Sequence, residues 1–140
     1  MSSNLIGVIV GIAFVFPAVY LVRKQKFDQW FWPITLATLP IYYMLFGLLV
    51  LDSQAILMEL LYGLPYIATG LLVWRLKSKV TVIIIAIAWL SHGFYDYYHD
   101  VLFINLGVFA WYPAFCGIVD IVVGSYLLIF SQQIPTSKQH

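Results

Sequence analysis

Five long apolar runs separated by short polar stretches divide the chain. Each run is close to the 20 or so residues that a helix needs to cross about 30 Å of hydrocarbon. Only 9% of the residues are charged and 63% are hydrophobic, whereas soluble domains usually carry about 25% charged residues. We therefore predict an all-α integral membrane protein, a five-span transmembrane helical bundle. The predicted spans are Leu5–Val22, Pro33–Leu51, Gln54–Trp74, Val80–Tyr98 and Pro113–Phe130.

The length of 140 residues suits one compact bundle without a second domain. We expect residues 1–130 to form a single transmembrane helical bundle, followed by a polar cytoplasmic tail at residues 131–140. The net charge of +1 gives no reason to expect nucleic-acid binding.

The basic residues predict the orientation of the bundle. All seven follow the first, third or fifth span and so fall on one side of a five-span protein: Arg23, Lys24, Lys26, Arg75, Lys77, Lys79 and Lys138. Lys and Arg gather on the cytoplasmic side of membrane proteins. We therefore expect the N-terminus outside and the C-terminus in the cytoplasm, and a location in the inner (plasma) membrane of a bacterium.

Ionisable residues gather at the outer end of the fourth predicted span, in the stretch SHGFYDYYHD. Helical residues turn by about 100° each, so His92, Asp96 and His99 share an arc of roughly 60°, with Asp100 beside it. A charged side chain that faces lipid costs at least about 3 kcal/mol. This face is therefore expected to point into the bundle.

Two acids on other spans are the expected partners of that face. Counted at about 1.5 Å of rise per residue, Glu59 and Asp120 lie at roughly the same depth as His92. Three predicted helices thus place ionisable groups at one level, near the outer surface.

Glycines at heptad spacing predict close packing of these helices. Gly63 and Gly70 lie on the face that carries Glu59, and Gly117 and Gly124 flank Asp120. Aligning YGLPYIATGLLV with CGIVDIVVGSYL matches both glycine pairs. The match raises a possible tandem repeat of spans 2–3 and 4–5, with the first span extra.

The apolar segment at residues 101–113 permits two interpretations. It forms either an interfacial or re-entrant lid over the acidic cluster, or the start of a fifth span that begins near Leu106 and is kinked at Pro113. Aromatic residues favour the headgroup level of a bilayer. Trp111 is therefore expected at the outer boundary, and Trp30 and Trp32 at the cytoplasmic one.

The cluster predicts a divalent-metal site held by His92, Asp96 and His99. Imidazole and carboxylate suit zinc, iron or manganese. His92 and His99 are about 10.5 Å apart along the helix, so either two ions bind or one histidine has another role. A metal-bound water becomes a nucleophile near neutral pH, and Glu59 or Asp120 would act as the catalytic general base.

The favoured hypothesis is a metal-dependent enzyme, such as a hydrolase, acting on a membrane lipid or another amphipathic small molecule that reaches the site from the outer leaflet. One alternative is a proton or cation transporter, because buried acids and histidines form such paths. Five spans are few for a transporter, so this alternative needs a homo-oligomer. The other alternative is a non-catalytic accessory subunit of a membrane complex.

Overall fold

The computed structural model describes residues 1–136, in which the regular structure consists of α-helices without strands. All five helices are long and apolar enough to cross a membrane, which indicates a membrane protein and confirms the predicted helical bundle. Lys138 and the other residues at 137–140 of the expected tail lie outside the described residues. The helices are α1 (Ser3–Lys24), α2 (Asp28–Leu49), α3 (Ser53–Val73), α4 (Lys79–Leu102) and α5 (Tyr112–Ser131).

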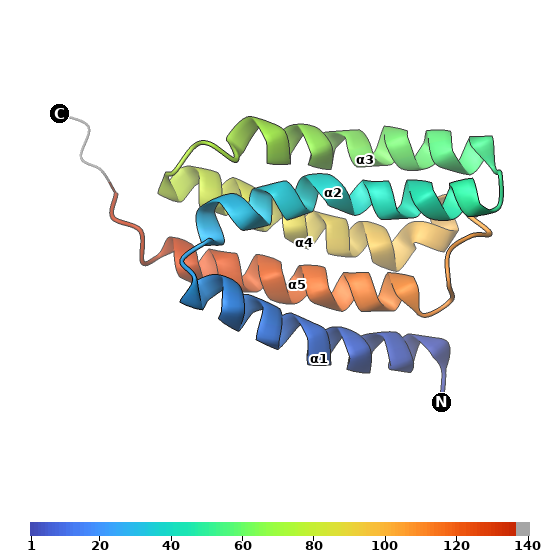
Figure 1. The fold of residues 1–140 in the computed structure, drawn as a ribbon, viewed down its shortest axis with the longest axis horizontal. Helices are drawn as coiled ribbons and strands as arrows, with labels where there is room; N and C mark the ends of the chain where they lie inside the picture. Colours follow the sequence, from blue (N-terminus) through green and yellow to red (C-terminus); the bar gives the residue numbers. More distant parts are fainter. Residues whose placement is uncertain (137–140) are drawn as a thin grey trace.

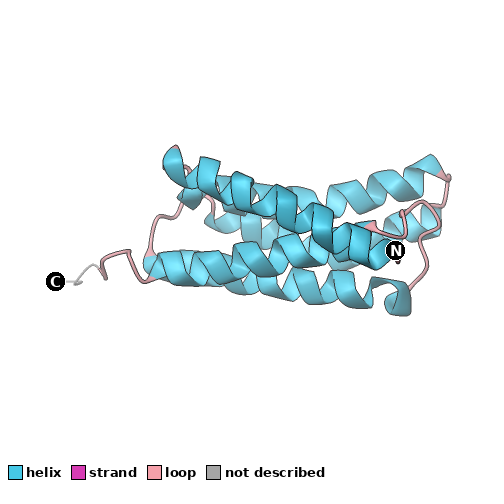
Figure 2. Ribbon diagram, turned by 90° about the horizontal axis from the view of Figure 1, so that it is seen from below, coloured by secondary structure: helices cyan, strands magenta, loops and turns pink. Residues whose placement is uncertain are grey.

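The helices run side by side and alternate in direction (Figures 1 and 2). α2 packs along α3, α4 packs along α5, and α1 lies mainly against α5. The chain is therefore built from two helical hairpins, with α1 added on the outside of the second.

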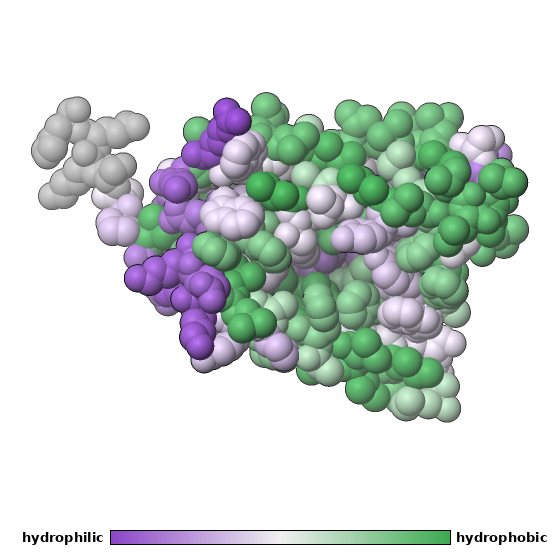
Figure 3. Space-filling view, viewed as in Figure 1, coloured by the Kyte–Doolittle hydropathy of each residue, from purple (hydrophilic) through white to green (hydrophobic). Residues whose placement is uncertain are grey.

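Hydrophilic residues gather at one end of the bundle, whereas the side in view is largely apolar (Figure 3). The end of α1, the end of α3 and the start of α4 meet there (Figure 1). This basic end carries Arg23, Lys24, Lys26, Arg75, Lys77 and Lys79. At the opposite end lie the N-terminus, the α2–α3 turn and the α4–α5 loop (Figure 1).

Close backbone approach holds each hairpin together. A Cβ atom on Gly70 would lie 2.3 Å from the carbonyl oxygen of Pro33 in α2. A Cβ atom on Gly124 would lie 2.6 Å from Cγ of Leu90 in α4. Both contacts are too short for any residue but glycine, as the heptad spacing predicted.

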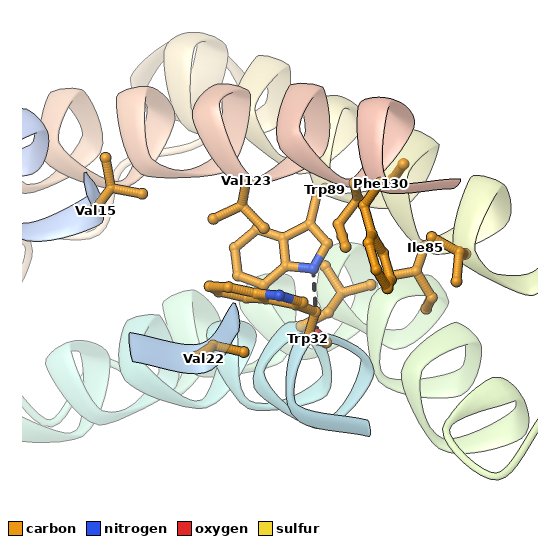
Figure 4. Packing of buried hydrophobic residues seen from close by; sticks show 11 residues of the cluster. Val15, Val22, Trp32, Ile85, Trp89, Val123 and Phe130 are labelled. Atoms are coloured by element: carbon orange, nitrogen blue, oxygen red, sulfur yellow. Dashed lines mark hydrogen bonds between the residues drawn. The ribbon is translucent and has the colours of Figure 1, made fainter. Parts of the chain in front are cut away.

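An apolar core fills the bundle between the basic end and the middle of α4 and α5. Trp32 and Trp89 meet edge to face, with ring centroids 5.8 Å apart, and the indole of Trp89 donates a hydrogen bond to the carbonyl of Trp32. Ile85 and Val123 pack around them (Figure 4). Trp32 is only 3% exposed, so its ring packs inside the bundle, and its expected depth at the membrane boundary stays a prediction.

Three predicted boundaries differ from the structure by more than two residues. α4 ends at Leu102, four residues beyond the predicted end at Tyr98. α2 begins at Asp28, five residues before the predicted start at Pro33. The helix extends toward the N-terminus beyond the apolar run and includes the residues QWFW. The segment between Leu102 and Tyr112 is a loop, and Pro113 lies in the first turn of α5, where proline is well tolerated. The fifth helix therefore does not begin near Leu106.

Candidate functional site

The ionisable face of α4 points into the bundle, as the helical period predicted. His92 and Asp96 are 1% exposed and His99 is fully buried. Glu59 of α3 and Asp120 of α5 are also buried. All five predicted site residues therefore lie in the interior, and the structure sorts them into two groups.

The first group joins α4 to α5. Nδ1 of His92 lies 2.6 Å from Oδ2 of Asp120 and 3.4 Å from Oδ2 of Asp96. One potential ligand atom from each of the three residues fits within 4.8 Å of the others. These three residues, His92, Asp96 and Asp120, are called the triad below.

Each residue of the triad keeps one polar atom that makes no hydrogen bond within the described chain, although Oδ2 of Asp96 lies near His92. These atoms are Nε2 of His92, Oδ2 of Asp96 and Oδ1 of Asp120. A buried polar atom without a hydrogen bond costs about 1–3 kcal/mol, and such atoms in native proteins often mark a bound ion or water. The triad can therefore accept a further ligand.

The second group joins α3, α4 and the α4–α5 loop around Glu59. Oε1 of Glu59 lies 2.8 Å from Nε2 of His99 and accepts a hydrogen bond of 2.9 Å from the amide of Asn105. Oε2 of Glu59 accepts a hydrogen bond of 2.8 Å from the hydroxyl of Tyr95. Each oxygen of Glu59 is thus satisfied. We call Glu59, Tyr95, His99 and Asn105 the clamp.

The clamp fixes the α4–α5 loop. The amide of Asn105 also donates to the carbonyl oxygen of Tyr43 in α2, at 3.1 Å, and its side-chain oxygen accepts from the backbone of Gly107. The loop is therefore tied to α2 and α3 through a buried side chain. The sequence analysis did not select Asn105, although a lone amide in an apolar stretch was a usable signal.

Tyr43 connects the two groups. Its hydroxyl donates a hydrogen bond of 2.8 Å to Oδ1 of Asp96, and its ring stacks on His99 with centroids 4.6 Å apart. The edge of Tyr66 meets His92 with centroids 4.6 Å apart. Two tyrosines from the first hairpin therefore orient residues that the second hairpin supplies. Neither could be singled out in a sequence with ten tyrosines.

The predicted metal ligands do not all come together. His92 and Asp96 lie in the triad, where Asp120, expected as a base, completes the group. His99 contacts Glu59 and, through Nδ1 at 3.2 Å, the exposed Asp100. The two histidines therefore have separate surroundings, which agrees with both alternatives: two bound ions, or another role for one histidine.

Two hollows flank the triad. One, of about 340 Å³, lies between α1, α2 and α5, and Asp120 is its one charged lining residue in the described chain. The other, of about 350 Å³, lies between α1, α4 and α5, and its lining includes Asn4, Asp96 and Asp100. Asp120 therefore lines a largely apolar hollow, and Asp96 lines a more polar one.

Comparisons with protein-family models, with curated proteins and with solved structures found no match to this chain.

Proposed function

We propose that this protein is a membrane-embedded metal-dependent enzyme whose triad holds one divalent cation. The observation that carries the proposal is the buried convergence of His92, Asp96 and Asp120, each with an unpartnered polar atom. The clamp serves as an internal comparison, because Glu59 is as deeply buried as the triad and yet both of its oxygens accept hydrogen bonds.

The donor set of the triad fits a divalent ion. One imidazole and two carboxylates are ligand types that zinc, iron and manganese accept. If both buried carboxylates are ionised, a divalent cation beside a neutral imidazole would balance their two negative charges. Three protein ligands leave a position open for water or substrate, as in catalytic rather than structural zinc sites.

Hydrolysis is the reaction class that this arrangement supports best, because a bound divalent ion supplies Lewis acidity toward a substrate oxygen and toward water. The residues of the chain would orient the site. Tyr43 holds Asp96 by a hydrogen bond, Tyr66 packs on His92, and the clamp keeps the α4–α5 loop over the same end of the bundle. An amphipathic substrate is favoured because the triad lies within membrane-spanning helices.

The proposed orientation places the basic end in the cytoplasm and the clamp near the outer surface, in a bacterial inner membrane. It rests on the gathering of basic residues at one end of the bundle. Asp120 is eight residues from the start of α5, about 12 Å along the helix. The triad would then lie below the outer surface, within reach of outer-leaflet lipids.

A transport role is less well supported. The apolar core around Trp32 and Trp89 fills the bundle between the triad and the basic end. Asp28, the buried acid at the basic end, is engaged by the hydroxyl of Tyr126 at 2.6 Å and by Arg23 at 3.7 Å. A path for ions would have to cross the tryptophan pair, so a site open to one side is the simpler interpretation.

The test is elemental analysis of protein purified without added metal and again after incubation with zinc, iron or manganese. We expect about one divalent ion per chain, and a loss of most of it in Asp96→Asn and Asp120→Asn. Asp28→Asn removes a buried carboxylate away from the triad and is the matched control, which should keep its metal. A parent protein without metal after incubation, or triad variants as metal-rich as the Asp28 variant, would overturn the proposal.

A further inference from the structure

The hollow between α1, α2 and α5 opens on the side of the bundle. Phe14 and Tyr42 belong to its lining and are 56% and 48% exposed, so its rim reaches the outer surface of the helices. α1 packs mainly on α5 and only slightly on α2, which leaves this side open. Because all five helices are able to span a membrane, the medium outside this rim is hydrocarbon.

The lining of this hollow is mostly apolar and aromatic. Phe31, Leu39, Phe115 and Val119 contribute to its walls, and Ala18 leaves room on the α1 side. Its volume of about 340 Å³ lies at the lower end of the 300–1,000 Å³ that ligand pockets span. A hollow of this size suits one narrow apolar chain better than the paired chains of a phospholipid.

The same hollow leads to the triad. Asp120 is among its lining residues, and Oδ1 of that buried carboxyl group has no partner within the described chain. On the other side of the triad, the second hollow carries Asn4 and the exposed Asp100 beside Asp96. An apolar hollow therefore borders the triad at Asp120, and a more polar hollow borders it at Asp96.

We infer that the hollow between α1, α2 and α5 binds the hydrocarbon chain of a single-chain amphiphile, whose polar head then lies at the triad. The molecule enters from the membrane through the side of the bundle, because the rim faces hydrocarbon. Burial of its chain against the apolar walls is favourable. The identity of the reacting substrate rests on the proposed function, but binding of the chain does not require a metal.

The experiment uses the full chain in phospholipid vesicles with a photoreactive fatty alcohol as the probe, because its neutral head is not repelled by Asp96 and Asp120. After illumination, mass spectrometry locates the adducts, which we expect on the lining, for example at Phe31 and Phe115. Ala18→Phe fills the hollow and should lower the yield of these adducts about tenfold, equivalent to ~1.4 kcal/mol. Ala13→Phe adds the same ring to the same helix outside the lining and should leave the yield unchanged.

A second variant and a competition experiment keep the result interpretable. Val119→Phe narrows the hollow from α5 and gives the same loss if Ala18→Phe fails to fold, as judged by thermal melting. An excess of unlabelled fatty alcohol should suppress the adducts, whereas the two-chain phospholipid of the vesicle should not. Adducts spread over all helices, or equal yields from the Ala18 and Ala13 variants, would overturn the inference.

A chelator arm distinguishes this inference from the proposed function. Adducts that persist after metal removal and still respond to Ala18→Phe support the chain site whether or not an ion binds. If the parent binds no metal but keeps these adducts, the proposed enzyme falls and the chain site stands. If metal binds stoichiometrically but the adducts are unspecific, the chain site falls and the metal centre stands.

Discussion

His92 and His99 lie on one face of one helix, and the structure predicts opposite effects of replacing them on metal binding. His92 faces its carboxylates through Nδ1, and His99 faces Glu59 through Nε2. Asparagine at position 92 and glutamine at position 99 place an amide nitrogen near the respective ring nitrogen. Each variant therefore keeps a hydrogen-bond donor toward its acid and loses the imidazole, which amides replace poorly as metal ligands.

The expected magnitude follows from the contacts of each ring. A metal present at 100 times its dissociation constant stabilises the folded protein by ~2.7 kcal/mol. With roughly 3–4 °C per kcal/mol for a chain of this size, metal removal should lower the melting temperature of the parent by about 8–11 °C. His99→Gln loses the stacking contact with Tyr43, worth about 1 kcal/mol. It should melt about 3–4 °C below the parent both with and without metal.

The assay is a thermal melt of each purified protein with and without chelator, together with metal content per folded chain. We expect the parent and His99→Gln to shift with chelator by similar amounts. His92→Asn should contain little metal and show no shift. Its melting temperature should lie slightly below that of the chelated parent, because the variant also loses the contact between His92 and Tyr66.

Two outcomes would refute this reasoning. If chelator shifts neither the parent nor the His99 variant after metal has been supplied, the triad does not hold an ion. If His99→Gln loses metal as completely as His92→Asn, the clamp belongs to the metal site. The separation of the two groups would then be wrong as a description of the loaded protein.

The remaining predictions concern packing and orientation. Gly124→Ala should destabilise the protein by ~1–3 kcal/mol, because the added Cβ would lie 2.6 Å from Leu90. Gly117→Ala should be neutral or stabilising, because the nearest neighbour of its Cβ lies at 3.6 Å. Equal denaturation midpoints for the two variants would contradict this. In a Cys116→Ala background, Ser53→Cys should react with an impermeant thiol reagent from outside, and Ser78→Cys should react only after the membrane is opened. Labelling of both cysteines from the same side would contradict the proposed orientation.

The sequence determined the class of protein and most of the helices. Uninterrupted apolar runs predict spans because a helix is one of the few structures that satisfy the backbone hydrogen bonds inside a membrane. α1, α3 and α5 begin and end within two residues of their predicted limits. The inward face of α4 was also predictable, because the helical period fixes which residues share a side. The apolar pattern could not locate the start of α2, since the helix extends beyond its most apolar part.

Only the tertiary structure decided which acid meets which histidine. Helical rise placed Glu59 and Asp120 at similar depth, but depth does not define on which side of α4 each neighbouring helix stands. The packing of α4 along α5 brings Asp120 to His92, and α3 with the α4–α5 loop brings Glu59 and Asn105 to His99. Pairing across a bundle depends on the rotation and neighbour order of whole helices. Those are set by close contacts such as Gly124 on Leu90, which arise from packing in three dimensions and leave no local pattern along the chain.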